Sequence, residues 1–345
     1  MVTRVDPFMA AHRGNTALKV LFIGGTGVIS AAAAQRAVAV GHRLSILNRR
    51  SQTRHPAPEG AEVLQADMRD TASVRAALGN RTFDVVVDFV VFTADQVAAD
   101  IELFTGRTGQ YVFISSASAY QKPPARLPIL ESTPLRNPFW QYARDKIACE
   151  DLLVKAYRED GFPATIIRPS HTYDRTMVAL TGGWTDVARL RAGKPVVVHG
   201  DGTSVWTLTH SSDFAKALVG LLGLAQAVGD SFTITSDEYL PWNRIYEIFA
   251  EAAGAPAPQL VHVASDTIAA AAPELGPSLL GDKSHSMIFD NSKVKALVPE
   301  FICTVPLALG ARQILSWFDA NPDEQMVDEG LDATFDQLIA AARAR

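Results

Sequence analysis

A tyrosine and a lysine four residues apart form a pair that could perform acid–base chemistry. Tyr142 and Lys146 lie in a stretch of helical character from Phe139 to about Glu159, so their spacing puts both side chains on one helix face. A phenol has an unperturbed pKa of about 10, and a nearby ammonium favours its ionised form. Tyr142 could therefore act as a base near neutral pH, although such a pair alone is typical of a solvated helix face.

Hydroxyl groups follow a buried strand upstream of that helix. The apolar segment Gln110 to Ile114 predicts a strand, and Ser115-Ser116-Ala117-Ser118 comes directly after it. In doubly wound sheets, ligands bind at the carboxyl ends of the strands. Ser116 is therefore expected to hold a substrate oxygen beside the phenol, with Ser118 as a second substrate contact. A serine-rich turn is the alternative for this motif taken singly.

A glycine-rich turn near the start of the chain predicts a dinucleotide site. Leu18 to Ile23 is an apolar run of strand length, Gly24-Gly25-Thr26-Gly27 follows it, and residues 31–40 have helical composition. In this strand–turn–helix context, glycines let the backbone approach a pyrophosphate, and the helix N-terminus offers unpaired N–H groups. Ser30 stands where a third glycine usually allows close helix–strand packing, and serine is small enough to replace it.

Short apolar strands alternate with helices through the first half of the chain. This pattern predicts an α/β fold with a doubly wound parallel sheet buried on both faces. The dinucleotide-binding domain is expected over residues 17–175, with segments returning near 200–235, and a smaller substrate-binding lobe over 176–345. Residues 1–16 lack the apolar stretch of a signal peptide and are expected to form a flexible tail. The expected strands are Leu18–Ile23, Arg43–Leu47, Glu62–Gln65, Phe83–Val87, Gln110–Ile114, Ala164–Ile167 and Ser231–Thr235.

Composition and charge disfavour several classes of protein. The chain has 345 residues, of which 48% are hydrophobic, which is enough for a sizeable core. Its net charge of −5 and the lack of a basic run beyond Arg49-Arg50 argue against a nucleic-acid partner. Two cysteines without disulfide or metal-ligand spacing suit a reducing cytoplasm, and no metal is expected. The most apolar long segment, 214–228, is too short to span a membrane.

Together these motifs resemble the extended or atypical branch of the short-chain dehydrogenase/reductase superfamily, of the NAD-dependent epimerase/dehydratase type. The resemblance runs from about Lys19 to Asp213 and implies a Rossmann sheet with a tightly bound, oxidised NAD or NADP. The motifs that carry it are Gly24-Gly25-Thr26-Gly27, Asp67-Met68, Ser116 followed four residues on by Tyr120, Tyr142 with Lys146, Arg168-Pro169, and Gly200-Asp201-Gly202. They are specific for the superfamily and not for a substrate.

The resemblance also implies roles for individual residues. Lys146 would hold the nicotinamide ribose and lower the pKa of Tyr142, the acid/base, while Ser116 would supply the catalytic hydroxyl. Family members commonly dimerise through two helices, here Asp95–Phe104 and Tyr142–Tyr157, so a homodimer is expected. The residues expected at the cofactor are Gly24, Gly27, Val28, Ile29, Asn48, Arg49, Asp67, Met68, Tyr142, Lys146 and Pro169.

Three departures from the family pattern bear on cofactor and substrate. The second strand ends in Asn48-Arg49 instead of the acid that grips the ribose in NAD-specific members; Arg49 could meet a 2′-phosphate, so NAD and NADP both stay open. Ser116-Ala117-Ser118 stands where sugar dehydratases place Thr-Asp-Glu, so their usual acid and base are missing. Trp206 takes the place of a diphosphate-clamping arginine, and its ring either stacks on a flat substrate group or packs in the core.

Few residues remain as a second acid or base. His171 follows the strand end expected at the nicotinamide, where it either faces substrate and takes part in catalysis or is hydrogen-bonded in the core. His210 lies near Trp206 and is a further candidate for substrate binding. Lys283 and His285 form a polar cluster that is expected on a solvated loop.

These observations predict an enzyme for a small-molecule substrate. It would oxidise a sugar hydroxyl of a nucleoside-like or nucleotide-sugar-like compound transiently to a ketone, eliminate or invert at the neighbouring carbon, and return the hydride. One alternative is an NADPH-dependent ketone reductase or alcohol dehydrogenase, which would consume its cofactor. The other is a non-catalytic RNA-binding member of the same fold.

Overall fold

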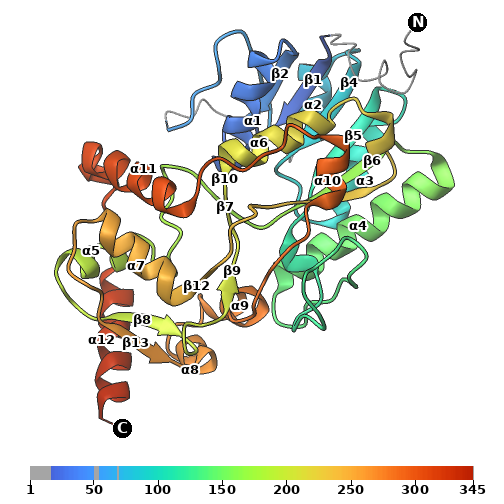
Figure 1. Cartoon of the computed structure of the whole chain (residues 1–345). Coiled ribbons are helices and arrows are strands. Elements are labelled where there is room, and N and C mark those ends of the chain that lie inside the picture. Colours follow the sequence, from blue (N-terminus) through green and yellow to red (C-terminus); the bar gives the residue numbers. More distant parts are fainter. Residues whose placement is uncertain (1–16, 50–53, 68–69, 345) are drawn as a thin grey trace, which may run out of the picture.

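A parallel sheet forms the upper half of the molecule (Figure 1). The computed structural model describes residues 17–49, 54–67 and 70–344. The strands of this sheet are β1 (Lys19–Ile23), β2 (Arg43–Asn48), β3 (Glu62–Gln65), β4 (Phe83–Asp88), β5 (Thr108–Ile114), β6 (Ala164–Pro169) and β11 (Ser231–Ile234). Their order, β11-β6-β5-β4-β1-β2-β3, is that of a doubly wound sheet. Successive strands are added on one side of β1 up to β3 and on its other side from β4 onward, so the topological switch point lies between β1 and β4. The predicted fold class is confirmed.

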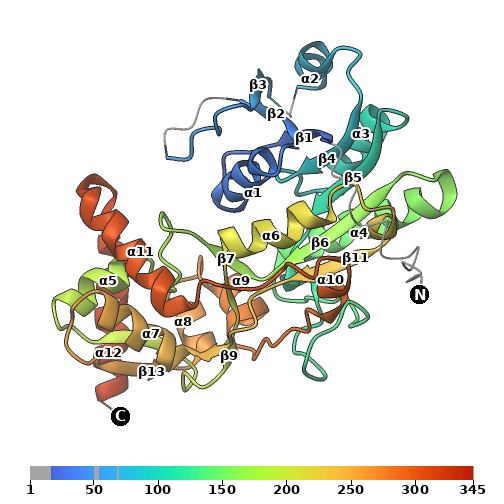
Figure 2. The same cartoon turned by 45° about the horizontal axis from the view of Figure 1, so that its top comes forward.

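Helices cover both faces of this sheet, which is why its strands are nearly continuous apolar runs. Val20 and Phe22 of β1 face α1, α6 and α10, whereas Leu21 and Ile23 face α2, α3 and α4. Figure 2 shows α1 and α6 side by side. The helices of this half are α1 (Val28–Ala39), α2 (Thr71–Leu78), α3 (Ala94–Phe104), α4 (Gln141–Asp160), α6 (Ser211–Leu221) and α10 (Ser292–Leu297).

Polar side chains begin α2 and α3. The carboxylate of Asp70 accepts the backbone N–H groups of Ala72 and Ser73, so Asp70 is the N-cap of α2. Thr93 is the N-cap of α3, and Gln96 accepts the backbone N–H groups of Phe92 and Thr93 at 2.7 and 3.2 Å. This second cap holds Phe92 in place above the end of β4.

Smaller elements form the lower half, which holds the carboxyl-terminal helix (Figure 1). The chain leaves the sheet at the end of β6 and builds three two-stranded pairings, β7 with β10, β9 with β12, and β8 with β13. We call this half the lobe. Its elements are β7 (His171–Tyr173), α5 (Trp184–Arg191), β8 (Val196–His199), β9 (Val205–Trp206), β10 (Leu208–His210), β12 (Leu240–Pro241), α7 (Trp242–Ala252), β13 (Leu260–Val263), α8 (Ser265–Ala271), α9 (Gly276–Ser278), α11 (Leu307–Ala320) and α12 (Glu329–Arg343).

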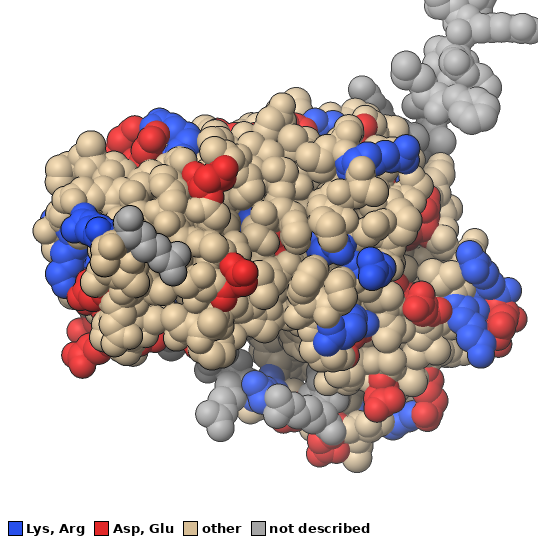
Figure 3. Space-filling view, turned by 90° about the horizontal axis from the view of Figure 1, so that it is seen from below, with Lys and Arg blue, Asp and Glu red and all other residues tan. Residues whose placement is uncertain are grey.

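Two segments after residue 176 belong to the sheet half. The helix α6 packs on α1, and β11 pairs with β6; further on, Val294 of α10 packs into the same apolar core. Residues 1–16, for which a flexible tail is expected, lie outside the described residues. Within the described ranges, no helix combines the length and apolarity needed to cross a membrane. On the face seen in Figure 3, acidic and basic side chains are interspersed among wide uncharged areas.

Candidate active site

Ser30 closes the glycine turn between β1 and α1. Its hydroxyl accepts the N–H of Gly27 at 2.7 Å and donates to the carbonyl of Gly24 at 2.6 Å. Gly24 has a φ of +80°, and a Cβ on it would come within 2.3 Å of Cγ1 of Val90. Only glycine therefore fits at this position, and the serine does more than substitute for a third glycine, because it ties the turn to the first turn of α1.

A cleft of about 970 Å³ lies over this turn, a size typical of cofactor sites. We call it the glycine cleft. Asn48 donates to the hydroxyl of Thr26 at 3.2 Å, and Gln65 donates to the carbonyl of Arg49 at 3.2 Å, so the ends of β2 and β3 are tied to each other and to the turn. The predicted cofactor residues that line it are Gly24, Gly27, Asn48, Arg49 and Asp67.

The glycine cleft fits a dinucleotide in shape and in donors. The glycines of the turn leave room for a pyrophosphate, and the turn leads directly into the N-terminus of α1, whose unpaired N–H groups favour an anion. Val28 and Ile29 belong to that first helical turn without lining the cleft, and Met68 lies outside the described residues. Phe92 also lines the cleft, and no sequence motif indicates it.

A second cavity, of about 270 Å³, holds the predicted catalytic tyrosine. We call it the tyrosine cavity. Phe92, which lines the glycine cleft, has its ring 6.3 Å from that of Tyr142, centroid to centroid. The predicted residues that the structure brings together around it are Ser116, Ser118, Tyr142, Pro169, His171 and Trp206.

Three hydroxyl-bearing residues, Ser116, Ser118 and Tyr142, line this cavity. The hydroxyl of Ser116 lies 2.8 Å from that of Ser118. Burial raises the pKa of Tyr142, its interaction with Ser116 lowers it, and the carboxylate of Asp282 raises it. The expected lowering of this pKa by Lys146 is therefore not what the protein by itself produces, because loss of hydration around the phenol is the largest effect.

Lys146 lies buried between the ends of β4 and β5. Its Nζ donates to the carbonyls of Val91 and Ile114 at 2.6 and 2.8 Å. The same atom lies 4.7 Å from the ring centroid of Phe92 and 5.8 Å from that of Tyr142. Burial lowers the pKa of Lys146 to about 8. The ammonium of Lys146 thus lies beside the rings of both Tyr142 and Phe92.

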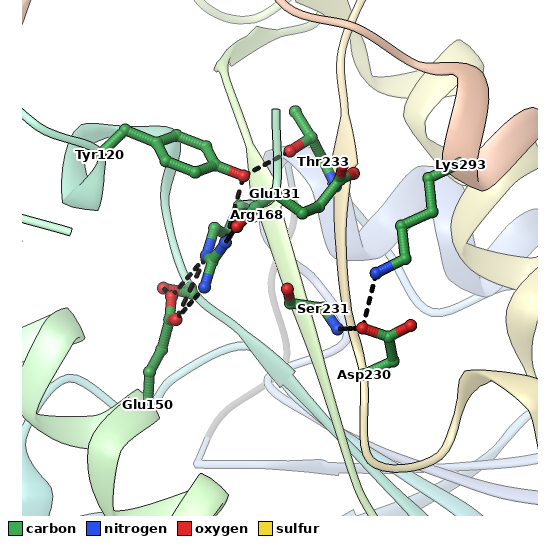
Figure 4. A network of polar contacts seen from close by, with 9 residues as sticks. Tyr120, Glu131, Glu150, Arg168, Asp230, Ser231, Thr233 and Lys293 are labelled. Carbon is green, nitrogen blue, oxygen red and sulfur yellow. Dashed lines mark hydrogen bonds and ion pairs between the residues drawn. The ribbon is translucent and has the colours of Figure 1, made fainter. Parts of the chain in front are cut away.

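A buried ion pair between Glu150 and Arg168 holds α4, the helix that carries Tyr142 and Lys146, against β6 (Figure 4). Glu150, one turn after Lys146, accepts Nε of Arg168 at 3.0 Å and the hydroxyl of Ser115. Nη1 of Arg168 also donates to the phenol of Tyr120 at 3.1 Å. This network joins α4 to the ends of β5 and β6, where the chain leaves the sheet for the lobe.

Trp206 and His171 reach the cavity from the lobe. The Trp206 ring packs at 5.8 Å, centroid to centroid, from Trp242 and is only 3% exposed, so most of the ring is core, and Trp206 also lines the cavity. Burial, followed by the nearby Lys283, lowers the pKa of His171 to about 3, so its ring is neutral. That makes His171 a hydrogen-bonding residue and a weak base.

The structure does not bring His210 to either cavity. Its Nδ1 lies 2.7 Å from the hydroxyl of Ser212 and accepts the N–H of the same residue, so the ring caps α6. The ring also packs edge-on against Tyr173, with the centroids 5.3 Å apart. His210 therefore has a structural place in this fold.

Two charged residues line the cavity although the sequence did not place them there. Asp282 and Lys283 end the π-helical turn Leu279–Lys283 and line the tyrosine cavity. The expectation of a solvated loop was wrong for Lys283, whose pKa burial lowers. No local signal distinguishes this polar cluster from an exposed one. In the part of the chain that the structure describes, no group of three or more acidic, His or Cys side chains could hold a metal.

Known proteins are similar to this chain in sequence. It is 28% identical over 256 residues to the chloroplast stem-loop binding protein of 41 kDa b of Arabidopsis thaliana, covering 71% of this chain and 65% of the plant protein. It is 27% identical over 246 residues to the 2'-dehydrokanamycin reductase of Streptomyces kanamyceticus, covering 69% of this chain and 68% of that protein. The alignment thus spans about two thirds of each relative.

Solved structures share the fold at low identity. Epimerase Mth375 of Methanothermobacter thermautotrophicus superposes with a TM-score of 0.73 at 16% identity, covering 93% of this chain and 98% of that one. The UDP-glucose 4-epimerase of Bifidobacterium longum, in complex with NAD+ and UDP, superposes with a TM-score of 0.68 at 18% identity, covering 88% and 99%. The family model for NAD dependent epimerases and dehydratases matches residues 20–234, from β1 to the end of β11, and the chain therefore belongs to the NAD dependent epimerase/dehydratase family.

Proposed function

We propose that this chain is an NAD(P)-dependent epimerase or dehydratase that acts on a sugar hydroxyl of a nucleoside-like or nucleotide-sugar-like substrate. The observation that supports this proposal is that Tyr142, Ser116 and Ser118 line one cavity, with Lys146 one helical turn behind the tyrosine. The ring of Tyr142 packs near Phe92, which lines the glycine cleft, and that cleft fits a dinucleotide.

A nicotinamide held in the glycine cleft would supply a hydride acceptor that can return the hydride to the same substrate. Ser116 donates to the oxygen of the reacting hydroxyl and orients it, supported by Ser118. Tyr142, once it has lost its own proton, accepts the hydroxyl proton as a phenolate, and loss of hydride from the same carbon would make the substrate a ketone. The ketone acidifies the neighbouring C–H bond, and its deprotonation leads to inversion or to loss of water.

The charges around Tyr142 decide when its proton leaves. In the protein alone, burial keeps the phenol protonated, and Lys146 contributes a positive charge 5.8 Å from the ring centroid. Deprotonation therefore becomes easier when substrate binding places a hydrogen-bonding hydroxyl against the phenol. For the second proton transfer, Asp282 is the carboxylate that lines the cavity.

Replacing Tyr142 by phenylalanine tests the proposal. The variant should lose turnover by a factor of about 10²–10⁴, the usual contribution of a positioned acid/base, while it keeps its cofactor. Mass spectrometry of ligands released from the purified protein would identify the cofactor and a trapped substrate for the assay. Tyr157→Phe, an exposed tyrosine on the same helix, is the matched control and should keep full activity. An unchanged rate in Tyr142→Phe would refute the mechanism.

A ketone reductase is the second candidate, and two observations favour it. The chain resembles a 2'-dehydrokanamycin reductase, and Arg49 lines the glycine cleft where a 2′-phosphate would meet it. A reductase consumes one reduced cofactor per ketone, whereas an epimerase or dehydratase leaves the cofactor unchanged after each turnover. Absorbance of the reduced nicotinamide during turnover separates the two.

The resemblance to a stem-loop binding protein raises RNA binding as a further candidate. A basic stripe would be its electrostatic requirement, and the face in Figure 3 intersperses both signs of charge instead. RNA binding that weakens steeply as salt rises would revive this alternative.

A further inference from the structure

Three side chains that line the tyrosine cavity carry a nitrogen atom with no hydrogen-bond partner among the described residues. These atoms are Nε1 of Trp206 on β9, Nε2 of His171 on β7, and Nζ of Lys283 at the end of the π-helical turn. Within the described chain, the first two atoms are buried and have no hydrogen-bond partner. For Lys283, the only favourable charge interaction is with its neighbour Asp282. Buried polar groups are normally paired, so unused nitrogens around one cavity point to a ligand.

The chemistry of these nitrogens calls for acceptor oxygens. An indole N–H and an ammonium can only donate hydrogen bonds, and the neutral ring of His171 can donate from one nitrogen. A ligand group that satisfies Trp206 and Lys283 together needs at least two acceptor lone pairs directed to different sides. A carboxylate has two such oxygens in one plane.

The charge balance of the cavity wall favours an anion. Asp282, the acidic residue there, lies 3.2 Å from Nζ of Lys122, a lysine that is 0% exposed. Since this ion pair neutralises Asp282, the charge of Lys283 has no equal partner among the described residues that line the cavity. A single negative charge on the ligand would balance it, whereas a doubly charged phosphate would exceed it.

The backbone of Lys283 is fixed before any ligand arrives. Its carbonyl accepts Nε1 of Trp242 at 3.1 Å and lies 3.0 Å from Nε2 of His199. The following segment is held against β9, where the N–H of Met287 donates to the carbonyl of Val205 at 2.8 Å. Lys283 and Trp206 are thereby held in one rigid unit, which lowers the cost of orienting two donors on the same group.

We propose that the substrate carries a carboxylate, which binds between Lys283, Trp206 and His171 while Tyr142 and Ser116 hold the reacting hydroxyl. The cavity of about 270 Å³ has room for one sugar ring, so the substrate class is a sugar acid of the hexuronate type, free or linked to a nucleotide. This inference rests on the proposed function and specifies its substrate.

Binding of a matched pair of ligands to the full chain, loaded with NAD+, tests the inference by calorimetry. Glucuronate and glucuronamide have nearly the same shape and differ in charge. Glucuronate should bind about tenfold more tightly, because a charge-assisted hydrogen bond is stronger than a neutral one. UDP-glucuronate forms a further arm: tighter binding than glucuronate identifies a nucleotide-linked substrate, and equal binding identifies the free acid.

Variants show whether Lys283 is the cause of this preference. Lys283→Met should remove it, Lys283→Arg should retain it, and Trp206→Phe should reduce it by removing one donor while keeping a ring. Lys295→Met, at an exposed ion pair with Asp237, changes the net charge equally and should leave the preference intact. Equal binding of glucuronate and glucuronamide, or a preference that survives in Lys283→Met, overturns the inference.

The same variants separate this inference from the proposed function. Tyr142→Phe should keep the preference for glucuronate while losing hydride transfer. A preference for glucuronate without any Tyr142-dependent conversion of a sugar substrate would overturn the proposed function alone. Conversely, Tyr142-dependent turnover of neutral sugars without a charge preference would overturn the carboxylate site alone.

Discussion

The glycine cleft and the tyrosine cavity are assembled in different ways. The cleft takes its walls from the ends of adjacent parallel strands, β1 to β4, and from the helices that follow them. The tyrosine cavity combines the end of β5, the start of α4, the passage from β6 to β7, β9 and the π-helical turn. One site is therefore local to the sheet, and the other depends on how the lobe docks against it.

This difference explains which residues local motifs can reveal. Parallel register aligns strand ends at one edge, so a motif after each strand is enough to place its residues together. No such regularity connects Lys283 to Tyr142, which lie more than a hundred residues apart in the chain. The tyrosine cavity therefore depends on the packing of the lobe, whereas the glycine cleft depends on the sheet half alone. Substitutions in each region should have different effects.

The joint between the two regions should give the largest effect. Arg168→Met leaves Glu150 buried without its partner, and unfolding by denaturant should show a loss of about 3–5 kcal/mol. The exposed pair of Arg75 and Glu102 provides the control, because Arg75→Met should change stability by about 1 kcal/mol or less. Equally small losses in both variants would show that the buried pair does not anchor α4 to β6.

Within the glycine cleft, Gly24→Ala should destabilise the protein by about 2–5 kcal/mol. The added methyl group combines a positive φ with an overlap against Val90, whose separate costs are about 1–2 and 1–3 kcal/mol. Gly41→Ala has a φ of +92° but no atom within 4 Å of the new Cβ, so it should show only the first cost. Similar losses at both sites in thermal or denaturant unfolding would contradict the close approach of Val90.

In the lobe, Asp186 should make stability depend on pH. Burial raises its pKa from 3.8 to about 6, so the folded state prefers the protonated carboxyl. Its stabilisation is complete below about pH 4 and is lost as pH rises through about 6, on the order of 2–3 kcal/mol in total. Asp186→Asn should therefore flatten the unfolding free energy across this range.

The pH dependence of the unfolding free energy that remains in Asp186→Asn should come from the sheet half. Burial also raises the pKa of Asp88, at the end of β4 beneath the glycine cleft, to about 6, with the same sign. Asp151→Asn, an exposed carboxyl on α4, is the control and should leave the pH profile unchanged. A profile identical in wild type and Asp186→Asn would show that this carboxyl is ionised without cost.

Arg49→Ala should produce the smallest change, confined to the cleft. If this guanidinium binds the 2′-phosphate, as we propose, NADP+ should bind about tenfold more weakly, a loss of about 1.4 kcal/mol, while NAD+, which lacks that group, keeps its affinity. Fluorescence titration with both cofactors measures the ratio, with Arg75→Ala as a remote control. An equal loss for both cofactors would assign Arg49 to a contact that they share.

The sequence by itself determined the sheet half. Apolar runs bounded by turns predicted its strands, and the glycine turn predicted the cleft; Asp70 and Thr93 are cap residues that begin α2 and α3. These features are local, because a strand, a cap or a turn is encoded by residues within a few positions of one another.

Tertiary structure alone decided which polar residues face the substrate and how their protons are held. It placed Lys283 at the cavity and His210 on a helix cap, and it raised the pKa of Tyr142 where the helix spacing predicted a lowered one. Burial is the physical reason. The water around a side chain is removed by segments from elsewhere in the chain, and desolvation then outweighs the charge one helical turn away.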